Sequence, residues 1–65
     1  MIYLLQETNP SKNGVFMYVG SHWKTGCQLQ IEENAYQFPS KNEAETCRRN
    51  LYDYCGMSLR IIEKN

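Results

Sequence analysis

The chain has 65 residues, which allows one domain spanning residues 1–65, with a small hydrophobic core and a narrow margin of stability. Seven basic residues balance seven acidic ones, which argues against a non-specific nucleic-acid binder and against an acidic mimic of DNA. The apolar runs are too short to cross a bilayer, so no membrane role is expected.

The first half of the chain has the pattern of three strands joined by turns. Ile2 to Glu7 is rich in strand-forming residues, and the Asn-Pro and Asn-Gly pairs of residues 8–14 predict a hairpin loop after it. Val15 to Val19 is entirely apolar or aromatic, which predicts a second strand with neither face in water. Residues 20–26, bracketed by glycines, form the next connection. Cys27 to Ile31 alternates apolar and polar residues, which predicts a half-buried third strand.

The second half predicts one helix and a last strand. Ser40-x-x-Glu43 has the form of a capping box, which indicates a helix start. One apolar stripe then continues over about four turns, and Gly56 is a natural C-cap. The stripe consists of Ala44, Cys47, Leu51, Tyr54 and Cys55. Ser58 to Glu63 is expected to form the final strand.

This order of elements predicts an α+β fold in which a four-stranded, mostly antiparallel sheet carries one helix on one face. A three-strand meander followed by a helical crossover places the last strand beside the first and parallel to it. The expected order of the strands across the sheet is third, second, first, fourth.

One helix covers one face of such a sheet, so side chains on the other face indicate what lies outside. We expect the aliphatic residues, including Ile2, Leu4 and Val19, to lie under the helix. The open face then carries an apolar patch, and patches of this kind tend to mark interaction sites. Its predicted members are Tyr3, Leu5, Phe16, Tyr18 and Ile62, with Gln28, Gln30 and Arg60 at the border.

Several structures would account for such a patch. The Trp23 loop or the chain ends fold over it and make it ordinary core, or a homodimer forms through it or through a sheet edge. Aromatic rings on adjacent strands also stack bases in readers of single-stranded RNA, although the basic groove is thin here.

Trp23, between His22 and Lys24, is either a lid on the open face or an exposed anchor for a partner. The candidate binding residues are Tyr3, Phe16, Tyr18, His22, Trp23, Lys24 and Arg60.

The three cysteines cannot all pair within one chain, and no signal peptide is apparent, so reduced thiols in the cytoplasm are expected. Cys47 and Cys55 lie eight residues apart on the predicted helix, about 12 Å along its axis. That spacing excludes a shared metal ion and a disulfide between them. His22 and Cys27 lack an orienting group and a pocket, so we predict no catalytic site, no metal site and no cofactor.

The pattern Ala35-x-x-Phe38-x-Ser40-x-x-Glu43-Ala44, which follows a strand hairpin, resembles small α+β proteins encoded by bacteriophages and other mobile elements. The resemblance implies a non-enzymatic inhibitor that acts in the host cytoplasm and occludes the surface of a host protein, such as a defence system. The alternatives are a nucleic-acid-binding accessory protein that uses the aromatic sheet face, and a structural subunit of a larger assembly.

Overall fold

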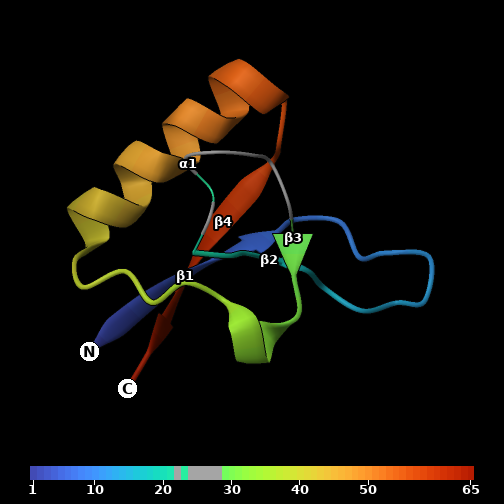
Figure 1. The fold of residues 1–65 in the computed structure, drawn as a ribbon, viewed down its shortest axis with the longest axis horizontal. Coiled ribbons are helices and arrows are strands. Elements are labelled where there is room, and N and C mark those ends of the chain that lie inside the picture. Colours follow the sequence, from blue (N-terminus) through green and yellow to red (C-terminus); the bar gives the residue numbers. More distant parts are fainter. Residues whose placement is uncertain (22, 24–28) are drawn as a thin grey trace.

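The structure is a computed structural model that describes residues 1–21, 23 and 29–65, and it confirms the predicted α+β fold and strand order. Four strands form one sheet in the order β3-β2-β1-β4, and one α-helix lies against it (Figure 1). The strands are β1 (Ile2–Glu7), β2 (Tyr18–Val19), β3 (Leu29–Gln30) and β4 (Leu59–Lys64). The helices are the 3₁₀ helix η1 (Glu32–Asn34) and the α-helix α1 (Lys41–Cys55). The second strand is shorter than predicted, and the start of the predicted third strand, residues 27–28, lies outside the described residues.

The prediction that the last strand runs parallel to the first is wrong. β4 pairs antiparallel with β1 over its whole length, from Leu59 opposite Glu7 to Lys64 opposite Ile2. The two termini therefore lie close together at one end of the sheet (Figure 1).

The reason for this direction is the segment 35–38, which pairs with the start of β1. Phe38 donates its N–H to the carbonyl oxygen of Tyr3 at 2.8 Å, and Tyr3 donates to the carbonyl oxygen of Phe38 at 3.0 Å. This antiparallel bridge returns the chain to the start of β1 before the helix begins. The 15 residues of α1 then span about 22 Å, which carries the chain to the opposite end of the sheet. β4 has to run back from there.

The ends of α1 follow the predicted caps. Ser40 has an extended backbone, and its Oγ accepts a hydrogen bond from the Glu43 N–H at 3.2 Å. Gly56 adopts φ 67°, a left-handed conformation that favours glycine, and donates its N–H to the Tyr52 carbonyl oxygen at 3.0 Å. Within the described residues, no helix combines the length and the apolar character that crossing a bilayer requires.

The main core lies between the helix and one face of the sheet. Its buried members are Leu5, Val19, Phe38, Ala44, Cys47, Leu51 and Leu59, and the half-buried Tyr3, Trp23, Cys55, Met57 and Ile61 pack against them. The predicted placement of Val19 under the helix is confirmed. Tyr3 and Leu5 also lie on this side, which overturns the prediction that they belong to the open face. Leu4, which was expected under the helix, is buried outside this cluster.

The cysteines differ from the expectation of three reduced thiols. Cys47 is a free thiol buried in the main core, as predicted, and its burial raises its pKa to about 12. Cys55 is disulfide-bonded, and its partner is outside the described residues. The odd number of cysteines leaves at least one of them unpaired within the chain but does not prevent the other two from forming a bond.

We predict that Leu5→Ala lowers the free energy of unfolding by about 2–5 kcal/mol, because it removes a fully buried side chain from the main core. The control Ile31→Ala, at a residue 46% exposed, changes it by about 0.5 kcal/mol or less. Urea denaturation followed by circular dichroism measures both. Equal losses in the two variants would contradict the placement of Leu5 under the helix.

We also predict that thiol labelling separates the cysteines. The native protein should resist iodoacetamide at pH 8, because the thiol of Cys47 is buried and protonated. Unfolding without reductant should expose one thiol per chain, and reduction should then expose all three. Intact-mass spectrometry counts the labels. Three labels on the unreduced, unfolded chain would exclude the disulfide, and Cys47→Ser should abolish the single label.

Candidate functional site

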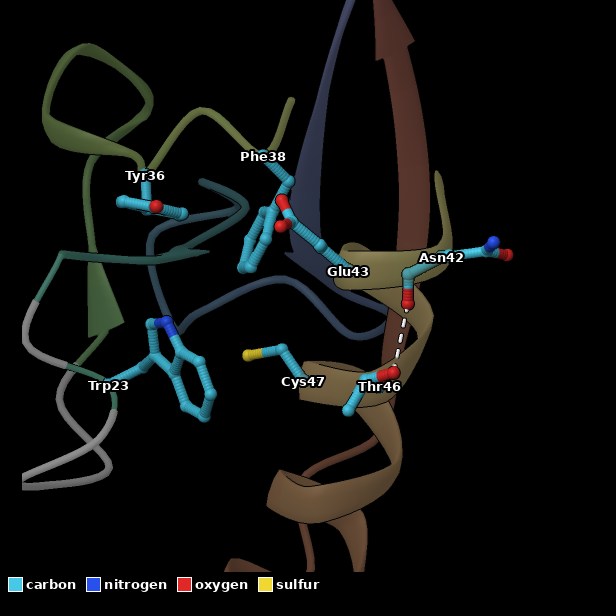
Figure 2. A pocket seen from close by; sticks show the side chains of 7 residues that line it. All are labelled: Trp23, Tyr36, Phe38, Asn42, Glu43, Thr46 and Cys47. Atoms are coloured by element: carbon cyan, nitrogen blue, oxygen red, sulfur yellow. Dashed lines mark hydrogen bonds between the residues drawn. The ribbon is translucent and has the colours of Figure 1, made fainter. Parts of the chain in front are cut away.

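The predicted binding residues do not form one surface. Phe16, Tyr18 and Arg60 come together on the sheet face opposite the helix, as the prediction required. Tyr3 lies on the helix side and packs against the main core. Trp23 also packs against the main core, next to the helix and away from the opposite sheet face (Figure 2). The predicted sites His22 and Lys24 lie outside the described residues.

A polar network closes much of the sheet face opposite the helix. Gln6 donates from Nε2 to the Tyr18 hydroxyl at 2.8 Å, and Arg60 donates from Nε to Gln6 Oε1 at 2.6 Å. The Arg60 guanidinium also lies over the Phe16 ring, 5.0 Å from its centroid, in a cation–π contact. Tyr18 is therefore 7% exposed, and the predicted open aromatic patch is not present at this residue.

An ion pair adds to this closure near the termini. Lys64 of β4 places Nζ 2.5 Å from Glu32 Oε2 of η1, although two strands separate β3 and β4 in the sheet order. The hydrogen bond to Glu32 and the charge of its carboxylate raise the pKa of Lys64. Both side chains are largely exposed, so the pair contributes modestly to stability. It does tie the C-terminal end of the chain to the segment after β3.

A cavity of about 350 Å³ lies instead beside the first two turns of α1. Its lining residues come from three segments: Trp23 before β3, Tyr36 and Phe38 from segment 35–38, and Asn42, Glu43, Thr46 and Cys47 from the helix. Figure 2 shows the three aromatic rings facing the helix, with the Cys47 thiol pointing into the space between them. The size is at the lower end of that of small-ligand pockets and suits one large side chain.

Two of the aromatic residues, Tyr36 and Phe38, are held by the sheet. Phe38 exchanges two backbone hydrogen bonds with Tyr3, and the Tyr36 N–H donates to the Val19 carbonyl oxygen at 2.9 Å. The Tyr36 and Phe38 rings meet edge to face with centroids 4.6 Å apart, which orients each against the other. Phe38 is 2% exposed and Tyr36 is 37% exposed, so the first supports the wall and the second forms its rim.

The carboxylate and amide side chains that line the cavity come from the helix, whereas Trp23 and Tyr36 contribute an indole N–H and a hydroxyl on the other side. Glu43 extends from α1 toward Phe38, whereas the side chain of Asn42 points away and Thr46 bonds to the Asn42 carbonyl oxygen at 3.0 Å (Figure 2). Because burial raises the pKa of Cys47 to about 12, its thiol is protonated at neutral pH and serves as an apolar floor, not as a nucleophile. The arrangement is suited to binding.

Sequence reasoning missed most of this cavity. Tyr36 and Phe38 flank the polar Gln37, and this spacing of two is compatible with an extended segment that directs both rings to the same side. Glu43 was recognised only as part of the capping box. The bridge between Tyr3 and Phe38 brings these residues together. It connects positions 35 residues apart, so no short-range sequence pattern indicates it.

Comparison of the chain with protein-family models, with curated proteins and with solved structures gave no match. In the described part of the chain, no three histidine, cysteine, aspartate or glutamate side chains gather in a group that could hold a metal ion. The proposed function therefore rests on the geometry of the site.

We predict that Tyr18→Phe costs about 1 kcal/mol of unfolding free energy, because Gln6 Nε2 loses its acceptor in a partly buried site. Tyr18→Glu should unfold the domain, since it places a carboxylate at a residue 7% exposed. Thermal denaturation measures both, with Tyr54→Glu, at a residue 86% exposed, as the control. A Tyr18→Glu variant as stable as the control would show that this face is open.

Proposed function

We propose that the protein is a protein-binding module that holds one side chain of its partner in the cavity lined by Trp23, Tyr36 and Phe38, here called the aromatic pocket. The observation that carries this proposal is an accessible cavity on a domain of 65 residues, with three aromatic lining residues, two of which, Tyr36 and Phe38, are held by backbone hydrogen bonds to the sheet. Tryptophan and tyrosine are enriched among the residues that dominate binding energy at interfaces. Walls fixed before binding also lower the entropy cost of association.

The aromatic pocket supports this function better than the sheet face opposite the helix. On that face, Tyr18 is buried and Arg60 covers Phe16, so those rings are engaged within the chain. The pocket rim at Tyr36 remains accessible. Occlusion of a host protein's surface is the form of protein binding that the resemblance to phage proteins implies, and it stays a prediction. A disulfide is typical of oxidising compartments, so the cytoplasmic location also stays a prediction.

The proposal is tested by selecting binders from a displayed library of random peptides against the immobilised protein. We expect the recovered peptides to bind the wild type and Tyr54→Ala alike and to lose about tenfold or more in affinity for Tyr36→Ala. Both changes remove an exposed tyrosine ring, one at the pocket rim and one on the last turn of α1. Isothermal titration calorimetry gives the affinities, and circular dichroism checks the fold.

Equal affinity of the selected peptides for the wild type and Tyr36→Ala would place their binding site elsewhere and would overturn the proposal. A library that yields no binder after repeated selection would count against it as well.

A further inference from the structure

Among the described residues, one carboxylate, that of Glu43, lines the aromatic pocket, and it has no cationic partner there. Glu43 occupies the third position of α1, where a capping box directs the glutamate side chain back to the N–H of Ser40. Ser40 does accept from the Glu43 N–H, but among the described residues the Glu43 carboxylate makes neither the reciprocal hydrogen bond nor an ion pair. It extends instead toward the Phe38 wall of the pocket (Figure 2).

The basic residues on the same helix form no ion pair with this carboxylate in the described part of the chain. Lys41 lies two positions before Glu43, and residues two apart on a helix do not face each other. Arg48 bonds to Glu45 through two nitrogens, and Arg49 lies 3.6 Å from a Glu45 oxygen. These contacts lower the pKa of Glu45 and raise that of Arg48, chiefly through their mutual hydrogen bond. Both arginines are thus engaged with Glu45. Neither compensates the negative charge of Glu43, which remains available to a ligand.

The N-terminus of α1 has the opposite effect from Glu43 on the charge of a ligand, because it favours an anion. A helix start carries roughly half a positive charge, which favours anions. Ser40 already satisfies one of its N–H groups, and the full negative charge of Glu43 exceeds the remaining partial charge. The electrostatic balance at the pocket therefore favours a cation and disfavours a phosphate or a carboxylate.

Aromatic walls beside a carboxylate are chemically suited to a basic side chain. Aromatic faces attract ammonium and guanidinium groups, and the chain itself uses this contact where Arg60 lies over Phe16. The aliphatic stem of lysine or arginine covers apolar surface well, and the buried Cys47 supplies such a surface at the floor. A volume of about 350 Å³ accommodates one such side chain.

We propose that the aromatic pocket binds a basic side chain, lysine or arginine, of a partner protein, with Glu43 pairing with its charged group and the aromatic walls enclosing its stem. This inference rests on the proposed function and specifies the chemistry of the partner. Acidic partners and nucleic acid phosphates are disfavoured by the same carboxylate.

The test uses four small probes: the Nα-acetyl amides of arginine, lysine, citrulline and norleucine. Citrulline is a neutral isostere of arginine, and norleucine keeps the four-carbon stem of lysine without its ammonium group. The chain has a single tryptophan, so the indole N–H signal of Trp23 in a ¹H–¹⁵N spectrum reports on the pocket. We expect arginine or lysine to shift this signal in a saturable way and the matched neutral probe to bind at least about fivefold more weakly. The stronger of the two basic probes identifies the side chain.

Two variants of the protein complete the test. Glu43→Gln should weaken binding of the basic probe about fivefold and leave the neutral probe unaffected. Asp53→Asn removes an exposed carboxylate ten residues further along α1, about 15 Å away along the axis, and should change neither. Both substitutions are at exposed positions, and thermal denaturation checks that the fold is retained.

The outcomes separate this inference from the proposed function. Equal binding of charged and neutral probes at Trp23, or basic-probe binding unchanged in Glu43→Gln, would overturn the preference for a basic side chain and leave a pocket that binds. Selected peptides that depend on Tyr36 but lack lysine and arginine would do the same. If no probe shifts the Trp23 signal, the inference fails, and the result of the peptide selection alone then decides the proposed function.

Discussion

The two hydrogen bonds between the backbones of Tyr3 and Phe38 determine the arrangement of the rest of the chain. They attach the segment after η1 to the start of β1, so that α1 begins at that end of the sheet and β4 has to return antiparallel to β1. The same bonds place Phe38 in the main core and Tyr36 on the surface beside it. One long-range backbone pairing thus sets both the topology and one wall of the aromatic pocket.

Local signals in the sequence were sufficient for the existence of the four strands and the α-helix and for their order, but not for η1 or for the length of β2. The capping residues Ser40 and Gly56 are short-range signals, and both have the predicted role. The direction of β4 and the choice of sheet face were not predictable in this way. Leu4 and Leu5 are adjacent and equally apolar, so nothing local distinguishes which one lies under the helix; the register of β1 against β4 and segment 35–38 decides it. The disulfide at Cys55 likewise depends on long-range proximity.

The sheet face opposite the helix shows how a small domain protects apolar surface without a second layer of helices. Tyr18 is covered not by an added element but by side chains of its own sheet, which link through Gln6 to Arg60. Arg60 is suited to this role because its planar group can donate to Gln6 and lie over Phe16 at the same time. The prediction placed Phe16 and Tyr18 correctly on this face of the sheet. It was wrong about their accessibility, because polar residues at the border of the patch cover them.

The aromatic pocket has a different energetic character, and this difference supports a role in binding. On the sheet face opposite the helix, the polar groups of Gln6 and Arg60 satisfy each other within the chain. At the pocket, Glu43 carries a full charge beside aromatic rings and has no cationic partner among the described residues. A bound cation could form a charge-assisted hydrogen bond with this exposed carboxylate. Among the described residues, Glu43 is thus an unpaired charge that lies at a cavity large enough to receive a side chain.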